Sequence, residues 1–323
     1  MLEEFELAER MIEKTIGLPE LLGKADEHTL IVIGNGFDMA HGIPSSYTNF
    51  REWLVKNGHE YLANSINSYF PDIEDVNYAV GKKQDIRWGD VEDGMGFYDE
   101  KAILEECRPR EEIDYDHTIQ STARVTDSVE AFFKPQLDEF RELFEEWVNS
   151  LDIKEVSPFL QVPNNAKYLS FNYTETLEQC YGIDPDKVLH IHGSRLPHGG
   201  KYVFGHFKKK TPNDVYGDEE SLTFEMEAHE NVVTWMNEWY KPTEDYIWEH
   251  RDLFWHLGDI NKVIFIGKTI NKVDEDYFDV IQKHIPNGAQ VYMTYHYDSE
   301  PFKIASYILN EGLPFEKWKL SKW

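Results

Sequence analysis

The chain has 323 residues, of which 41% are hydrophobic and 14% aromatic, and this composition excludes an intrinsically disordered protein. Sixty acidic and 32 basic residues give a formal net charge of −28, which repels phosphate backbones and disfavours direct nucleic-acid binding. The two cysteines, Cys107 and Cys180, are too few for a disulfide framework or a four-thiolate zinc site.

The N-terminal segment 1–18 carries acids where a secretory signal would carry bases. No apolar run approaches the roughly 18 to 20 residues that span a bilayer. We therefore expect a cytoplasmic protein without a membrane partner. The densest basic run, Lys208–Lys210, is short and typical of a solvated loop.

The apolar pattern predicts a helix followed by a set of strands. Phe5, Ala8 and Ile12 recur at helical spacing and predict an amphipathic helix over 3–15. Six apolar, β-branched or aromatic runs predict strands at 29–34, 167–173, 187–193, 201–206, 262–268 and 289–295. Helical patterns between several of these runs predict βαβ units. The expected fold class is therefore α/β, a Rossmann-like parallel sheet of about six strands flanked by helices, with ligands bound at the carboxyl ends of the strands.

The segment between the first two predicted strands is far longer than a βαβ crossover needs and has no strong strand signal. It predicts a large, mainly helical insertion after the first strand. We therefore divide the chain into a core, 1–54 with 166–323, and a helical, acidic insertion at 55–165. Twelve acids and four bases within 85–116 predict a solvated surface there.

Large apolar residues spaced by three or four predict a helical seam at the end of the insertion. They are Phe133, Leu137, Phe140, Phe144, Trp147 and Leu151. Packing within the insertion's own core is the favoured interpretation of this seam, and a homo-oligomer contact is the alternative. A further helical stretch is predicted over 224–257, with an interruption at Pro242.

The first strand leads into a glycine-bearing turn, "IGNGFDMAHGIP", at 33–44. A Gly-x-Gly turn between a strand and a helix lets the backbone approach a phosphate, and the helix N-terminus supplies unpaired N–H groups. The full dinucleotide fingerprint fails, because Met39 holds the position of its third glycine and no strand ending in an acid follows about twenty residues later. A plain tight turn would explain the glycines nearly as well.

Two further strand ends carry polar side chains. Asn172 ends a strand and is expected to face the crevice, with Thr174 as the cap of the next helix, although an amide there can also be a turn-former. His190 and His192 lie two apart and are expected on one face of a strand. They can be core histidines, a metal-binding pair, or one general base with a neighbour.

Metal binding ranks below the general-base role. His198 and His206 lie nearby in the sequence, but no His-Asp-His ligand series with suitable spacing completes a site. We expect no metal.

Four segments resemble the NAD-binding segments of sirtuins. Gly34-Asn35-Gly36-Phe37-Asp38, three residues, then Gly42-Ile43-Pro44 resembles the sirtuin segment that holds NAD, with Asp38 in place of a serine. Asn172 resembles the asparagine that orients ribose hydroxyls or water, and His192 resembles the histidine that acts as a base. Gly267 and Thr269 match the Gly-Thr-Ser position used against ribose and phosphate.

Together with "WGDVE" at 88–92, these segments resemble the bacteriophage abortive-infection family AbiH over nearly the whole chain, and that family is similar to the sirtuin group. The resemblance implies a Rossmann-like, NAD-binding core and a role in halting phage infection. It assigns no role to Trp88-Gly89-Asp90.

The resemblance to sirtuins narrows the chemistry. Sirtuin deacetylases carry a four-cysteine zinc ribbon, which two cysteines cannot build, so deacetylation is disfavoured. The resemblance instead implies hydrolysis of NAD to nicotinamide and ADP-ribose, restrained until a phage-derived trigger arrives. Asn172 would hold the ribose or water, His192 would take the proton, and Asp38 would contact a ribose hydroxyl.

Two other classes of function stay open. One is a non-catalytic module that binds NAD or ADP-ribose as a sensor. The other is a metal-dependent nuclease or phosphoesterase built on His190, His192 and acids, against whose nucleic-acid form the net charge argues.

Overall fold

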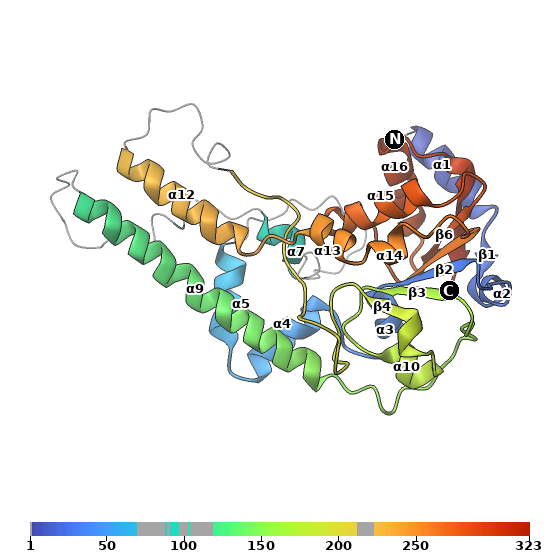
Figure 1. Ribbon diagram of the computed structural model, residues 1–323, viewed down its shortest axis with the longest axis horizontal. Coiled ribbons are helices and arrows are strands. Elements are labelled where there is room, and N and C mark those ends of the chain that lie inside the picture. Colours follow the sequence, from blue (N-terminus) through green and yellow to red (C-terminus); the bar gives the residue numbers. More distant parts are fainter. Residues whose placement is uncertain (1, 70–87, 89–90, 97–102, 104–118, 212–222) are drawn as a thin grey trace. The chain divides into compact units, whose positions relative to one another are not determined.

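A parallel sheet organises the larger part of this chain. The computed structural model describes residues 2–69, 88, 91–96, 103, 119–211 and 223–323. It divides into two compact units (Figure 1). Unit 1 comprises Met1–Ser45, Ser150–Val203 and Thr243–Trp323, and unit 2 comprises Ser46–Asn149 and Phe204–Pro242. Most of the acidic stretch at 85–116 lies outside the described residues.

Unit 1 contains one sheet, with seven strands among the described residues. In sheet order they are β1, β7, β6, β5, β2, β3 and β4, and every neighbouring pair is parallel. Their bounds are Ile16–Gly17 (β1), Thr29–Ile33 (β2), Lys167–Ser170 (β3), Val188–His190 (β4), Lys262–Ile266 (β5), Gln290–Tyr295 (β6) and Trp318–Lys322 (β7). The predicted fold class, a parallel sheet flanked by helices, is confirmed.

The strand order defines where a ligand crevice belongs. Apart from the two-residue strand β1, the order β4-β3-β2-β5-β6-β7 is the 3-2-1-4-5-6 arrangement of doubly wound dinucleotide-binding folds. The direction of winding reverses between β2 and β5, which pair in register from Thr29 with Lys262 to Ile33 with Ile266. Ligands of such folds bind outside the carboxyl ends of the strands at this switch point.

Helices cover both faces of the sheet because the strands are apolar on both. Within β2, Leu30 and Val32 face one core and Ile31 and Ile33 face the other. The first face is packed by α1 (Leu2–Ile12), α13 (Thr243–Glu249), α14 (Arg251–Phe254), α15 (Glu275–His284) and α16 (Glu300–Asn310). The second is packed by α2 (Leu18–Leu22), α3 (Asn35–Ala40) and α10 (Thr176–Tyr181). Three short 3₁₀ helices complete the described part of unit 1, η1 (Pro185–Lys187), η2 (Lys272–Asp274) and η3 (Phe315–Lys317).

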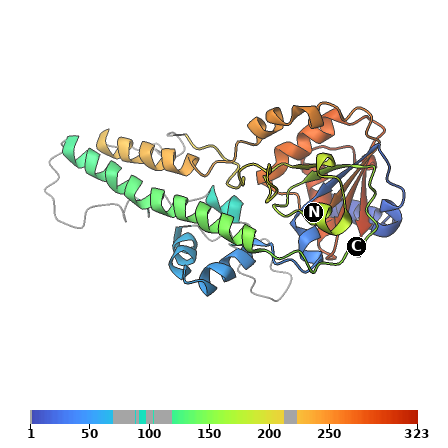
Figure 2. The ribbon, with the colours of Figure 1, turned by 60° about the horizontal axis from the view of Figure 1, so that its bottom comes forward.

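Unit 2 is helical in its described residues. Its helices are α4 (Tyr47–Lys56), α5 (Glu60–Tyr69), α7 (Val91–Met95), α9 (Ile119–Ser150, whose last residue belongs to unit 1) and α12 (Thr223–Asn237). The long helix α9 and α12 lie side by side in both views (Figures 1 and 2). Phe133 of α9 shares a buried cluster with Met236 of α12. Phe140 and Phe144 pack against Phe50 of α4, so the predicted seam does pack within this unit.

One predicted strand is absent from the structure, and two strands of the structure, β1 and β7, are not predicted from the sequence. Residues 201–205 form no strand and His206 makes only an isolated bridge with Tyr240, because Gly205 has φ 140° and takes the chain out of the extended region. Strand β1 is too short to leave a pattern. Strand β7 was missed because Lys319 separates the buried Trp318 and Leu320, which leaves no continuous apolar run. Among the described residues, no helix is both long and apolar enough to cross a membrane.

Candidate functional site

The glycine turn after β2 is packed onto the turn after β5. The N–H of Gly34 donates to the carbonyl of Ile266 at 3.0 Å, and the N–H of Gly36 donates to the carbonyl of Gly267 at 2.8 Å. A Cβ on Gly36 would lie 2.8 Å from the Cα of Gly267. Gly267 itself has φ 62°, and its Cβ would lie 2.2 Å from the nitrogen of Phe37. These glycines therefore allow two backbones to touch at the switch point of the sheet.

The residues that follow Gly36 divide between core and surface. Phe37 is fully buried, and its ring lies 4.5 Å from that of His41 and 5.8 Å from that of Tyr181. Ile43 is buried as well, and Gly42 has φ 78°, a left-handed conformation that favours glycine. This part of the predicted segment therefore anchors the turn to the sheet.

Three other residues of the predicted nucleotide-binding set are exposed. Asn35 is at the surface, where its side-chain oxygen accepts a hydrogen bond from the hydroxyl of Ser45. Pro44 and Thr269 are exposed too. Asn35 and Thr269 follow the paired strands β2 and β5, so both lie beside the switch point.

Asp38 is a fully buried carboxylate, held by residues that follow the neighbouring strand β3. It accepts hydrogen bonds from the hydroxyl of Thr174 and, at 2.9 Å, from that of Thr176. Burial raises the pKa of Asp38 to about 6, against the opposing effect of hydrogen bonds from Thr174, Thr176 and Asn172. The prediction that Thr174 caps a helix is wrong, because α10 has Glu175 at its N-cap and the Thr174 hydroxyl is bound to Asp38.

Asn172 belongs to the same group of hydrogen-bonded side chains as Asp38, and one of its polar atoms has no hydrogen-bond partner among the described residues. It follows β3, is 5% exposed, and hydrogen-bonds to the Asp38 carboxylate. Its side-chain oxygen has no partner among the described residues, although it is buried. A buried acceptor without a donor costs free energy, on the order of 1–3 kcal/mol, which a ligand hydroxyl or N–H would recover.

His190, the last residue of β4, lies between two acceptors. Its Nδ1 is 2.9 Å from the backbone carbonyl of Asn172, and its Nε2 is 2.8 Å from Glu178 Oε1. Burial lowers the pKa of His190, but the hydrogen bond and charge of Glu178 outweigh it and leave the pKa raised. The imidazolium, which donates from both nitrogens, satisfies both acceptors.

His192 has a different carboxylate partner from His190. Strand β4 ends at His190, so His192 lies beyond the strand and the two do not share one strand face as expected. The Nε2 of His192 is 3.5 Å from Asp274 Oδ1, longer than an ordinary hydrogen bond, and the other oxygen of Asp274 pairs with the ammonium of Lys268. The side chains of His192 and Asp274 are 5% and 4% exposed.

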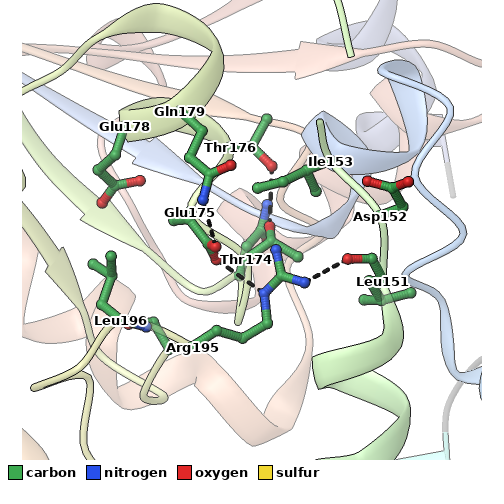
Figure 3. A network of polar contacts seen from close by, with 12 residues as sticks. Leu151, Asp152, Ile153, Thr174, Glu175, Thr176, Glu178, Gln179, Arg195 and Leu196 are labelled. Atoms are coloured by element: carbon green, nitrogen blue, oxygen red, sulfur yellow. Dashed lines mark hydrogen bonds and ion pairs between the residues drawn. The ribbon is translucent and has the colours of Figure 1, made fainter. Parts of the chain in front are cut away.

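An ion pair between Arg195 and Glu175 holds the loop between Asn172 and α10 (Figure 3). Arg195 donates from Nε to Glu175 Oε2 at 2.9 Å and from Nη1 to the carbonyl of Leu151. Glu175 also accepts from Gln179 at 2.7 Å. The backbone N–H of Arg195 also donates to the carbonyl of Tyr173 at 3.1 Å, so residues on both sides of Thr174 are held in place.

The turns that the sequence placed at strand ends therefore meet. Gly36 contacts Gly267 directly, and Asp274 connects the turn after β5 to His192 beyond β4. Strand spacing puts the ends of β5 and β4 roughly 14 Å apart along the edge of the sheet, within the length of a dinucleotide. Asn172 and Asp38 lie along the same edge.

Four residues of this edge were not singled out from the sequence: Thr176, Glu178, Lys268 and Asp274. Lys268 and Asp274 lie inside the segment "GKTINKVDED", where an aspartate before a helix is ordinarily a cap. Their pairing depends on tertiary contacts that no local pattern encodes. Among the described residues, no group of three or more His, Cys, Asp or Glu side chains has an arrangement suited to a metal ion.

Comparison with known proteins supplies the family. The family model described as "Bacteriophage abortive infection AbiH" matches residues 30–297, more than four fifths of the chain. The chain belongs to the AbiH family. The matched range runs from Leu30 of β2 past the end of β6. It includes the polar residues at the carboxyl edge of the sheet, namely Asp38, Asn172, His190, His192 and Asp274.

AbiH membership implies a role in abortive infection of bacteriophage. No curated protein and no solved structure matches the chain. The chemistry of this AbiH protein is therefore argued from its own residues.

Proposed function

We propose that this AbiH protein binds NAD at the carboxyl edge of the unit 1 sheet and hydrolyses it to nicotinamide and ADP-ribose. The observation that carries the proposal is the switch point between β2 and β5, with Gly34 and Gly36 on one side, Gly267 on the other, and Asn172 and His192 at the ends of the next two strands. The likeness of these segments to sirtuin motifs supports the same ligand.

The side chains present suit a ribose. Its hydroxyls are donors, and the side-chain oxygen of Asn172 is a buried acceptor without a partner in the described chain. Asp38 lies behind Asn172 and fixes its amide, because the carboxylate accepts from the amide nitrogen. This bond supports a role in which Asp38 acts through Asn172 rather than by direct contact with the sugar.

The reaction needs little acid catalysis. The bond between ribose C1′ and the nicotinamide nitrogen breaks, its electron pair neutralises the charged ring, and C1′ becomes oxocarbenium-like. A water oxygen then bonds to C1′, and its proton passes to His192. A positioned base contributes roughly 10²- to 10⁴-fold, and electrostatic stabilisation of the cation contributes further.

One observation favours a second function, a sensor that binds NAD or ADP-ribose without turnover. The side chain of His192 is only 5% exposed, and its Nε2 faces Asp274. A base so enclosed reaches a water molecule only after the edge of the sheet opens. In the hydrolase this opening is the step that a phage-derived trigger would supply, because unrestrained loss of NAD would kill the host. In the sensor it does not occur.

Nicotinamide release tests the proposal. Purified wild-type protein is incubated with NAD, alone and with an extract of phage-infected cells freed of small molecules, beside the variants His192→Ala and His198→Ala. His198 is exposed in the same loop and is the matched control. We expect release to fall roughly 100-fold or more in His192→Ala and to persist in His198→Ala.

Two outcomes would remove the hydrolase. One is equal release from wild type and His192→Ala, and the other is no release under either condition. Calorimetry with NAD then decides for or against the sensor, since a sensor gives saturable heat with the ligand recovered intact.

A further inference from the structure

The backbone of Asn172 is held by side chains where the pairing of β3 with β4 stops. The carbonyl of Ser170 still accepts from the backbone N–H of Ile191 at 3.0 Å. The N–H of Asn172 then donates to the hydroxyl of Ser170 at 3.2 Å, and its carbonyl accepts from Nδ1 of His190 at 2.9 Å. The side-chain amide is bound by Asp38, so Asn172 is fixed at three points and its side-chain oxygen is left without a partner among the described residues.

Glu178 of α10 fixes the ring of His190. Nε2 of His190 lies 2.8 Å from Glu178 Oε1, and the two side chains are 6% and 7% exposed. A carbonyl and a carboxylate only accept hydrogen bonds, so both ring nitrogens donate and the ring is an imidazolium. The other oxygen of Glu178 has no hydrogen-bond partner among the described residues. The Glu178 carboxylate therefore depends on His190 for its hydrogen bond.

The charges around His190 favour the imidazolium. The ring interacts electrostatically with the carboxylates of Glu178 and Glu175, which belong to α10 and its N-cap, and with that of Asp38 on α3. Arg195, in the loop after β4, pairs with Glu175. Burial lowers the pKa of His190, but the hydrogen bond and charge of Glu178 raise it by more, so the balance is upward.

We infer that His190 and Glu178 are the positioning residues of Asn172. Their ion pair holds the backbone of Asn172 and so directs its side-chain oxygen toward the ligand. The inference rests on the proposed function, in which that oxygen binds the ribose of NAD or ADP-ribose, and it applies to the hydrolase and to the sensor alike. It adds what holds the ribose acceptor in place, and it makes ligand binding depend on the proton of His190.

Loss of one proton from His190 breaks the bond to Asn172. The neutral ring has one N–H for two acceptors. The proton stays on Nε2, because the Glu178 carboxylate is charged and has no other donor in the described part of the chain. Nδ1 then turns a lone pair toward the Asn172 carbonyl, which moves away. In Glu178→Gln the side-chain NH₂ donates to Nε2 instead, so the neutral ring carries its proton on Nδ1 and keeps its bond to Asn172.

ADP-ribose binding tests the inference, because it requires no turnover. Calorimetry is performed on either side of the folded pKa of His190, which NMR titration locates. We expect the affinity of wild type to fall roughly three- to tenfold as pH rises through this pKa, and that of Glu178→Gln to stay constant. Asp38 titrates in both proteins, so its contribution cancels in the comparison. Asp259→Asn, which removes the carboxylate beside the exposed His28 before β2, should behave as wild type. The same pH dependence in wild type and Glu178→Gln would overturn the inference.

The tautomer of His190 decides the inference even if wild type binds no ADP-ribose. The ¹⁵N signals of His190 are assigned by their loss in His190→Ala. Above the folded pKa they should place the proton on Nε2 in wild type and on Nδ1 in Glu178→Gln. The ¹³C signal of the Asn172 carbonyl should shift as pH rises through this pKa in wild type and stay in place in the variant. The same tautomer in both proteins would overturn the inference. No saturable binding by wild type, together with the expected tautomers, would remove the proposed function and support the positioning.

A double variant separates positioning from folding. His190→Leu combined with Glu178→Leu removes both charges, so no unpaired charge stays buried and the fold should persist, as measured by circular dichroism. The carbonyl of Asn172 then has no donor at any pH. We expect this variant to bind ADP-ribose roughly tenfold more weakly than wild type below the folded pKa of His190. Wild-type affinity in the folded double variant would overturn the inference.

Discussion

The carboxylate of Asp38 accepts a hydrogen bond of 2.9 Å from the hydroxyl of Thr176, which lies 138 residues further along the chain. This bond joins the turn after β2 to the start of α10 at the carboxyl edge of the sheet. It also places an ionisable group where no water reaches it, since Asp38 is 1% exposed.

The first prediction concerns Asp38 and pH. Its pKa of about 6 when folded, against 3.8 as the reference value, means that the folded state binds more protons between these values. Stability therefore falls as pH rises from 4 to 6, by about 3 kcal/mol in total. Asp38→Asn removes this cost, so the free energy of unfolding of the variant should rise relative to that of wild type as pH rises.

Urea unfolding of wild type and Asp38→Asn between pH 5 and 8 measures this difference. The gap in free energy of unfolding should be wider at pH 8 than at pH 5. Asp186→Asn, at an exposed acid, controls for the loss of one surface charge. A gap that stays constant with pH would contradict the burial of an ionised Asp38.

The second prediction separates backbone conformation from close packing at Gly267. Gly267 and Gly312 have φ 62° and 60°, but a Cβ at Gly267 would lie 2.2 Å from a backbone nitrogen, whereas one at Gly312 would meet nothing within 4 Å. Gly312→Ala should cost about 1–2 kcal/mol for the left-handed conformation alone. Gly267→Ala should cost about 2 kcal/mol more, because two turns must separate. Equal costs in chemical denaturation would show that the turns are not in contact.

The third prediction concerns His190. Glu178→Gln removes the charge that holds the pKa of His190 above its ordinary value, so this pKa should fall in the variant, as measured by NMR titration. The ion pair stabilises the fold below the unfolded pKa of about 6.5, and this contribution is lost as pH rises through the folded pKa. The variant should therefore lose more stability at pH 6 than at pH 9. Glu139→Gln is the control, because Glu139 and the half-buried His59 form the same kind of pair in contact with water. It should lower the free energy of unfolding by less than Glu178→Gln does.

The fourth prediction gives the "WGDVE" segment a structural role in unit 2. Trp88 is fully buried, and Glu92 accepts from the N–H of Gly205 at 3.0 Å and lies 3.6 Å from the ammonium of Lys241. Because Lys241 is fully buried, Glu92→Ala should cost about 3–5 kcal/mol. Adding Lys241→Met to Glu92→Ala should recover part of that loss. A single variant as stable as wild type would refute the buried pair.

The fold was predictable because its strands are buried on both faces. Thr29–Ile33 and Lys262–Ile266 are continuous apolar segments, a pattern that predicts buried strands. The long helical interval between the first two predicted strands indicates an insertion. Residues 201–206 resemble a strand in composition, but the positive φ of Gly205 takes the chain out of the extended region. Strand β7 is not predicted from the sequence, because Lys319 interrupts its apolar residues.

The site was predictable only to the level of strand ends. Parallel strands bring their carboxyl ends to one edge, so Gly34, Asn172 and Gly267 were placed together by topology alone. The hydrogen-bond and ion-pair partners of these side chains were not predictable. Tertiary packing determines that Asp38 pairs with Thr174 and that Asp274 pairs with Lys268. Thr174 illustrates the difference: its position before a helix predicts a cap, yet a buried carboxylate nearby takes the hydroxyl.

The contact between Gly36 and Gly267 also bears on how the protein is made. The two glycines are separated by most of the chain, and β2 gains its neighbour β5 only after Lys262–Ile266 have been synthesised. Until then the glycine turn after β2 has no second turn to pack against. The pairing of β2 with β5 is a long-range contact, and such contacts form late in folding. A polypeptide that ends before Lys262–Ile266 therefore lacks the turn on which the glycines after β2 pack.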